Sequence, residues 1–102
     1  MKEVTAKDLA TEIKAGDVIV DLFGVGCGNC KMLEPVLAQL EKENPSVVFL
    51  KVNVDEAADL VEEHGIATLP TLLLFKDGEM VEKLVGLKPK VIIGKKIAEI
   101  FG

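Results

Sequence analysis

Residues 18–40 read VIVDLFGVGCGNCKMLEPVLAQL, and this segment carries the patterns that most strongly indicate the fold. Its first six residues are apolar at every position but one, which is typical of a central β-strand covered by helices on both faces. A glycine-rich turn from Gly24 to Gly28 follows, and apolar residues then recur at helical spacing. Cys27 and Cys30 are therefore expected to straddle the N-terminus of a helix.

Outward from this segment, the sequence predicts further helices and strands. Before the segment, a helix is capped by Thr5 and ended by Gly16. After it come a strand at 47–54, a helix from Glu56 to His64 that Gly65 stops, strands at 71–75 and 80–85, and a final helix with Pro89 in its first turn. The strand, helix and strand between residues 18 and 54 favour parallel pairing. Asp77 and Gly78, between the last two strands, favour a tight antiparallel hairpin.

Composition places the chain among folded globular proteins. Its 102 residues are 49% hydrophobic, so one domain covering residues 1–102 with a single core is expected. The net charge of −5 and the dispersed lysines argue against nucleic acid as a partner. No apolar run approaches the roughly 18 residues of a membrane span, and the first five residues lack a hydrophobic signal region. We therefore expect a soluble cytoplasmic protein with no membrane partner.

The two cysteines are the place where chemistry is expected. A disulfide between residues so close in sequence closes too small a loop to stabilise a fold, so a catalytic or metal-binding role is favoured. The partial positive charge of a helix N-terminus stabilises a thiolate, which makes Cys27 the expected nucleophile and Cys30 the thiol that resolves the mixed disulfide. A zinc site within the chain would need about four ligands, and His64 is the one further soft candidate. Zinc shared across a dimer stays an alternative.

Two charged residues in neighbouring predicted strands are further candidates for the site. Asp21 lies between apolar residues, so burial should raise the pKa of its carboxyl group. Such a group can move a proton near neutral pH, and we predict that Asp21 acts as general base for Cys30, directly or through water. Lys51 is a candidate to pair with Asp21. The alternatives are a solvated Asp21 at a sheet edge and a Lys51 whose ammonium group reaches solvent.

The cysteine pair, Asp21 and Lys51 lie in stretches of sequence that resemble the thioredoxin family. The active-site stretch of that family usually runs Asp-Phe-Trp-Ala-x-Trp-Cys-Gly-Pro-Cys-Lys, and residues 21–31 here read DLFGVGCGNCK. Other stretches match in the same order, namely Pro35, Lys51 to Asp55, Gly65-Ile66, Pro70 to Gly78 and Val85-Gly86. The similarity therefore spans nearly the whole chain.

The resemblance implies an α/β thioredoxin fold, with a central mixed β-sheet of four to five strands flanked by about four helices. It makes Cys27 the attacking thiol, Cys30 the resolving thiol, Asp21 the buried acid and Lys51 its neighbour. It also implies a cis proline beside the disulfide, where the backbone pairs with an extended substrate segment. By the same resemblance, the substrate-binding residues are Gly26, Gly28, Asn29, Leu69, Pro70 and Gly86.

Three of the departures from the family pattern bear on function. Phe23 and Gly26 stand where tryptophans are usual, and Asn29 replaces the proline between the cysteines. The loss of a large apolar side chain at position 26 is expected to alter the choice of partner. Asn29 supplies a backbone donor at the helix start that proline lacks. Because that donor favours the Cys27 thiolate, the pair is predicted to be a stronger oxidant than a usual thioredoxin.

The expected function is that of a thiol–disulfide oxidoreductase that reduces disulfides in cytosolic proteins. The resemblance implies disulfide-containing protein substrates and a dithiol donor, either a flavin-containing thioredoxin reductase fed by NADPH or another, dedicated one. No bound cofactor is expected, because Gly24, Gly26 and Gly28 lack the spacing of a nucleotide-binding fingerprint. No metal is expected within the chain, because it offers too few ligands. A monomer is expected. A glutaredoxin-like enzyme, a more oxidising exchange protein, a metal-binding protein and an adaptor stay open as alternatives.

Overall fold

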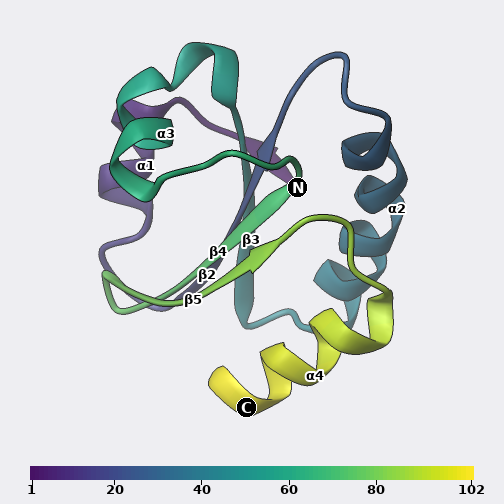
Figure 1. Cartoon of the computed structure of the whole chain (residues 1–102). Helices are drawn as coiled ribbons and strands as arrows, with labels where there is room; N and C mark the ends of the chain where they lie inside the picture. The colour runs from purple at the N-terminus through teal and green to yellow at the C-terminus, as the bar shows by residue number, and fades with distance from the viewer.

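The computed structural model describes all of residues 1–102 and contains a five-stranded sheet with helices on both faces (Figure 1). The strands are β1 (Lys2–Glu3), β2 (Asp17–Phe23), β3 (Val47–Asn53), β4 (Thr71–Lys76) and β5 (Glu79–Val85). The helices are α1 (Ala6–Glu12), α2 (Gly28–Glu43), α3 (Ala58–His64) and α4 (Lys90–Ile100), with a 3₁₀ helix, η1, at Val54–Glu56. This architecture confirms the predicted fold class.

The sheet is mixed, and its strands lie in the order β1-β3-β2-β4-β5. Strand β3 pairs in parallel with both β1 and β2, whereas β4 runs antiparallel to β2 and to β5. The predicted parallel unit and the predicted hairpin are both confirmed. Strand β1 was not predicted, because its two exposed residues carry no strand pattern of their own and are extended only through their pairing with β3.

Strand β2 lies at the centre of the sheet and is buried on both faces, as its sequence predicts. Val18, Val20 and Leu22 pack into a core cluster on the side of α1 and α3. Ile19 points to the opposite side, into a second cluster with buried residues of α2 and α4. Because side chains alternate along a strand, Asp21 lies on the same side as Ile19, facing α2. The helix pairs on the two sides can be followed in Figure 1.

Helix α2 begins directly after the first cysteine. Cys27 is the N-cap, with an extended backbone (φ −88°, ψ 110°), and its Sγ accepts a hydrogen bond from the N–H of Cys30 at 3.1 Å. The helix buries one face, made of Cys30, Leu33, Leu37 and Leu40. The cysteines therefore straddle the helix N-terminus, as predicted.

Two predicted helix boundaries are wrong. Helix α1 ends before Gly16, at a C-cap formed by Ile13, and Gly16 (φ 83°) lies in the turn that leads into β2. There its N–H donates to Oδ1 of Asp77 at 2.8 Å, and its carbonyl accepts from the N–H of Asp77 at 2.9 Å. Gly16 is therefore placed by a contact with the distant hairpin, which the local sequence does not reveal. Pro89 caps α4 and lies just outside its first turn, with φ −63° and ψ 150°.

The helix predicted from Glu56 to His64 starts later, as α3 at Ala58, because Glu56 is the last residue of η1. Ala57 separates them, because its backbone (φ −142°, ψ 45°) leaves the helical region while its side chain is buried in the core. Helix α3 does end as predicted, at Gly65 in the left-handed conformation (φ 60°). No helix in the structure combines the length and the apolar character needed to cross a membrane.

The turn between β4 and β5 provides a test of the fold. Asp77 (φ 50°) and Gly78 (φ 89°) both have positive φ, as a two-residue hairpin requires. Gly78→Ala is expected to lower the free energy of unfolding by about 1–2 kcal/mol, because a Cβ is strained at that φ. Gly94→Ala is the matched control, since a Cβ there would make an ordinary 3.6 Å contact with Leu40.

Replacement of glycine by alanine should therefore change the free energy of unfolding in opposite directions at positions 78 and 94. Gly94→Ala, inside α4, is expected to raise stability by about 0.5–1 kcal/mol. Urea unfolding followed by far-ultraviolet circular dichroism is the measurement, because the chain has no tryptophan or tyrosine to report by fluorescence. Equal stabilities for the two variants would contradict the assigned turn.

Candidate active site

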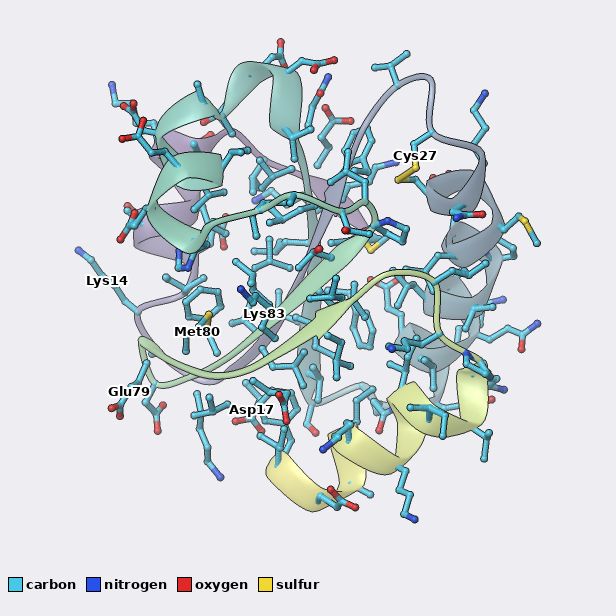
Figure 2. All side chains as sticks on the ribbon, viewed as in Figure 1. Lys14, Asp17, Cys27, Glu79, Met80 and Lys83 are labelled. Atoms are coloured by element: carbon cyan, nitrogen blue, oxygen red, sulfur yellow. A yellow bond between two sulfur atoms is a disulfide. The ribbon has the colours of Figure 1, made fainter.

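Cys27 and Cys30 form a disulfide at the N-terminus of α2, with their Cα atoms 5.3 Å apart. Figure 2 shows Cys27 where the loop after β2 enters α2. Cys27 is partly exposed, whereas Cys30 is only 4% exposed and packs on the buried face of the helix. A partner molecule can therefore reach the first sulfur but not the second.

The surroundings of Cys27 favour a negative charge on its sulfur. The Cys30 N–H already points at Sγ, and the first turn of α2 contains no acidic residue. A helix N-terminus carries unpaired N–H groups and a partial positive charge, both of which stabilise a thiolate. The arrangement is suited to nucleophilic attack by Cys27.

Asp21 is buried in the middle of the sheet, next to the cysteines. Asp21 is only 1% exposed, and its Oδ1 atom has no hydrogen-bond partner. Burial, reinforced by the charge of Glu34 and opposed by that of Lys51, raises the pKa of the Asp21 carboxyl group to about 7. This agrees with the predicted raised pKa and excludes the alternative of a solvated edge position, because β2 is the central strand.

Lys51 does not make the ion pair that the sequence suggested. It lies beside Asp21 in the parallel register of β2 and β3, but its Nζ binds Oε1 of Glu34 at 3.0 Å. The ammonium group also lies 5.4 Å from the centre of the Phe23 ring. The Lys51 side chain is 23% exposed and that of Glu34 is 50% exposed, so this pair keeps contact with water. A pair with the fully buried Asp21 would have required more desolvation of the ammonium group.

Glu34 is a site residue that the sequence analysis missed. It lies four residues after Cys30, and residues at that spacing share a face of a helix. The spacing is the signal that was available. It does not say which lysine or carboxylate the glutamate meets, because that depends on how α2 packs on the sheet.

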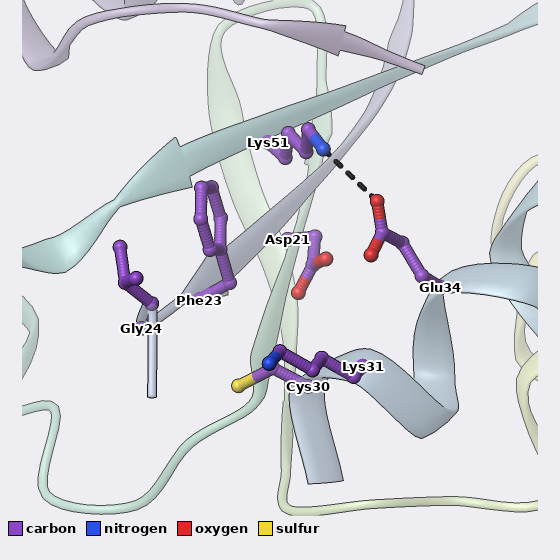
Figure 3. Close-up of a pocket in the computed structure, with 8 residues that line it drawn as sticks. Asp21, Phe23, Gly24, Cys30, Lys31, Glu34 and Lys51 are labelled. Carbon is purple, nitrogen blue, oxygen red and sulfur yellow. Dashed lines mark hydrogen bonds and ion pairs between the residues drawn. The ribbon is translucent and has the colours of Figure 1, made fainter. Parts of the chain in front are cut away.

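A cavity of about 200 Å³ connects these residues (Figure 3). Its lining includes Asp21, Cys30, Glu34 and Lys51, and the Asp21 carboxyl group points between Cys30 and the Lys51–Glu34 pair. Charged side chains are part of the lining, and a cavity of this size has room for water molecules. Asp21 and Cys30 therefore face the same space.

The loop before β4 lies against the cysteine loop. The Leu69–Pro70 peptide bond is cis, as the resemblance implied, and Pro70 is buried. A Cβ built on Gly24 would lie 3.0 Å from Cδ1 of Leu69 and 3.8 Å from Cβ of Cys27. Gly86 (φ 85°) joins the same region, because its N–H donates to the carbonyl of Pro70 at 2.8 Å.

The other predicted substrate-binding residues surround the disulfide on the surface. Gly26, Gly28 and Asn29 are exposed in the loop and in the first turn of α2. Two apolar side chains that the sequence analysis did not single out are also exposed there, Val25 at 65% and Met32 at 62%. Both residues lie within two positions of a cysteine in the sequence, and both expose apolar surface.

His64 lies at the end of α3, as predicted, and its carbonyl accepts a hydrogen bond from Nζ of Lys83 at 3.2 Å. No three or more histidine, cysteine, aspartate or glutamate side chains are grouped so that they could hold a metal ion. The disulfide, the buried carboxyl group and the cavity between them are thus the chemical features of this site.

The chain is similar to known proteins over nearly its whole length. The sequence model of the family described as Thioredoxin matches residues 1–99. Thioredoxin from Chlamydia caviae is 47% identical over 90 residues, which is 88% of each chain. The structure superposes on oxidised mitochondrial thioredoxin 3 from Saccharomyces cerevisiae with a TM-score of 0.89 at 29% identity, covering 98% of this chain and 95% of that one. For Plasmodium falciparum thioredoxin the TM-score is 0.90 at 30% identity, covering 98% and 99%.

The raised pKa of Asp21 predicts how stability depends on pH. The carboxyl group titrates near pH 7 in the folded chain and near its ordinary value of 3.8 in the unfolded chain. Between these values the folded chain binds the extra proton, so stability must fall as the pH rises. We expect the oxidised chain to lose about 2–3 kcal/mol of unfolding free energy between pH 5 and pH 8.

Urea unfolding of the oxidised chain at a series of pH values measures this slope, because the disulfide prevents the cysteines from titrating. Asp21→Asn should remove most of the slope. Asp59→Asn, a matched substitution at an exposed site on α3, should retain it. A slope that survives in Asp21→Asn would show that another group is responsible.

Proposed function

The chain belongs to the thioredoxin family, and from this premise we propose how its residues divide the work of thiol–disulfide exchange. It is a thiol–disulfide oxidoreductase that acts on protein disulfides, with a reductase or another dithiol donor to regenerate it. The observation that best supports the division is the unequal burial of the two cysteines. Cys27 is partly exposed at the helix N-terminus, and Cys30 is buried behind it.

In the first step, Cys27 is the attacking nucleophile. Its thiolate attacks one sulfur of a substrate disulfide, so that a Cys27–substrate disulfide forms and the substrate S–S bond breaks. The other substrate sulfur leaves as a thiolate and takes a proton from water. The exposed sulfur and the donors at the start of α2 support this role.

In the second step, Cys30 resolves the mixed disulfide. Asp21 accepts the Cys30 proton through water in the shared cavity, and the resulting thiolate attacks Sγ of Cys27. The intramolecular disulfide forms, the bond to the substrate breaks, and the second substrate sulfur leaves as a thiolate. A carboxyl group that titrates near pH 7 is matched to this task, because it is ionised in part of the molecules at neutral pH and basic enough to take the proton.

Substrate binds across the loops that surround the disulfide. We assign backbone pairing with an extended substrate segment to Leu69, and the remaining contact positions to Gly26, Gly28, Asn29, Pro70 and Gly86. The packing of Leu69 against the cysteine loop and the hydrogen bond between Gly86 and Pro70 support this assignment. Backbone pairing tolerates many substrate sequences, which suits a general disulfide reductase.

We also propose that the protein works as a monomer in the cytoplasm. A disulfide reductase needs a compartment in which dithiol donors keep it reduced, and the cytosol is such a compartment. After each cycle, a thioredoxin reductase or a dedicated dithiol donor reduces the Cys27–Cys30 disulfide again. The exposed cysteine of a monomer leaves room for both partners to approach in turn.

Turnover of insulin disulfides with dithiothreitol as electron donor tests the function. The native chain should accelerate insulin reduction, and Cys27→Ser should abolish that acceleration because the attacking thiol is lost. Cys30→Ser should form mixed disulfides that persist, because the first step remains and the second cannot follow. Mass spectrometry of the trapped species identifies the sulfur that is bonded to the substrate.

Other outcomes would separate the alternatives. A trapped adduct on Cys30 instead of Cys27 would reverse the proposed roles. Absence of turnover in the native chain, together with tight one-to-one zinc or copper binding by its reduced form, would favour a metal-binding protein. Turnover that depends on glutathione would favour a glutaredoxin-like enzyme.

Asn29 is proposed to make the disulfide more oxidising than the usual family motif. Its N–H adds a donor at the helix start, where it stabilises the Cys27 thiolate of the reduced form. Asn29→Pro removes that donor, and we expect the reduction potential to become more negative by about 30 mV, which is a tenfold change in the equilibrium constant. Equilibration of Cys27–Cys30 with glutathione buffers measures the potential, and equal potentials for the two chains would refute the proposal.

A further inference from the structure

Glu34 lies where it can control the charge around Asp21. It follows Cys30 by one helical turn on α2, and its Oε1 holds the Lys51 ammonium group at 3.0 Å. Lys51 is the register partner of Asp21 on the neighbouring strand, so it is the cation best placed to neutralise that carboxylate. The structure directs it to Glu34 instead, and Oδ1 of Asp21 is left without a partner.

We propose that Glu34 is a positioning residue of the exchange reaction, which holds Lys51 away from Asp21 and so keeps Asp21 basic enough to take the Cys30 proton. This inference rests on the proposed role of Asp21 as the base for Cys30. Glu34 does not touch the reacting sulfur atoms in this role. It acts through Asp21 in two ways, by engaging the lysine and by placing its own negative charge beside the cavity.

The charged groups around the cavity are few, which makes their effects separable. Helix α2 contributes Lys31 and Glu34, beside the disulfide-bonded Cys30, and β3 contributes Lys51. Strand β4 places the apolar Leu72 opposite Asp21. The charge of Glu34 raises the pKa of Asp21 and that of Lys51 lowers it, in addition to the larger effect of burial.

A purely structural role for the Lys51–Glu34 pair predicts a different result. The pair is partly exposed, and exposed ion pairs contribute little to stability. Loss of Glu34 should therefore leave the fold intact while it changes the titration of Asp21. A pH profile distinguishes the two roles, because a lost structural contact would change rates or stability without moving a pKa.

The first measurement is the pKa of Asp21 in the oxidised chain, taken from the carbon-13 chemical shift of its carboxyl group. Glu34→Gln should lower this pKa by about one unit, because a negative charge is removed and Lys51 is released toward Asp21. Lys51→Met should raise it. Glu43→Gln is the matched control, since Glu43 lies on the same helix and binds Lys90 at 2.6 Å without lining the cavity.

The second measurement follows the reaction itself. Reduced chain is mixed with 5,5′-dithiobis(2-nitrobenzoate), and the slower release of coloured thiolate reports the attack of Cys30 on the Cys27 mixed disulfide. The acidic limb of its pH profile should move to lower pH in Glu34→Gln by the same amount as the Asp21 pKa, and should stay in place in Glu43→Gln.

The two measurements separate failure of this inference from failure of the proposed function. An unchanged Asp21 pKa in Glu34→Gln, in a chain that still reduces insulin, would overturn the role of Glu34. So would a shifted pKa with an unmoved kinetic profile. Absence of insulin turnover in the native chain would instead contradict the exchange function, whatever Asp21 does.

Discussion

Asp21 holds a carboxyl group out of water at a position on β2 that the strand otherwise fills with apolar side chains. Its neighbour on the same side, Ile19, is part of the core under α2 and α4, and both flanking strands shield it. An ionised carboxylate is costly to bury, so the group holds its proton up to near neutral pH. This burial lowers the stability of the folded chain at pH values where the carboxyl group must ionise.

The rest of the site is arranged around that buried group by two ordinary structural elements. Strand β2 ends in a glycine-rich loop, and α2 begins at Cys27, so the helix N-terminus and its donors lie beside the disulfide. The packing of α2 over the sheet brings Cys30 and Glu34 to the same cavity as Asp21. The first cysteine lies at the helix terminus and the second lies beside the cavity that contains the carboxyl group, so the two sulfur atoms have different environments.

The departures from the usual family motif affect the surface more than the buried chemistry. Gly26 removes a large side chain next to Cys27, while Val25 and Met32 expose apolar surface on either side of the disulfide. The exposed apolar surface near the cysteines therefore comes from smaller side chains than the tryptophan of the usual motif. The buried carboxyl group and the lysine of the neighbouring strand are retained, and that lysine is paired with Glu34.

The features that could be predicted from the sequence are those that depend on residues close together in the chain. The central strand, the helix that begins at the cysteines and the Asp77-Gly78 hairpin follow from local spacing, because side-chain alternation, helix capping and positive φ act within a few residues. The burial of Asp21 also followed, since only a covered strand is apolar on both faces. The partner of Lys51, the contact of Gly16 with Asp77 and the pairing of β1 could not be predicted from the sequence. Each of these contacts joins residues from separate elements, so it depends on the tertiary structure. The reason is that a charged or extended segment has several possible partners, and only the packing of helices on the sheet selects among them.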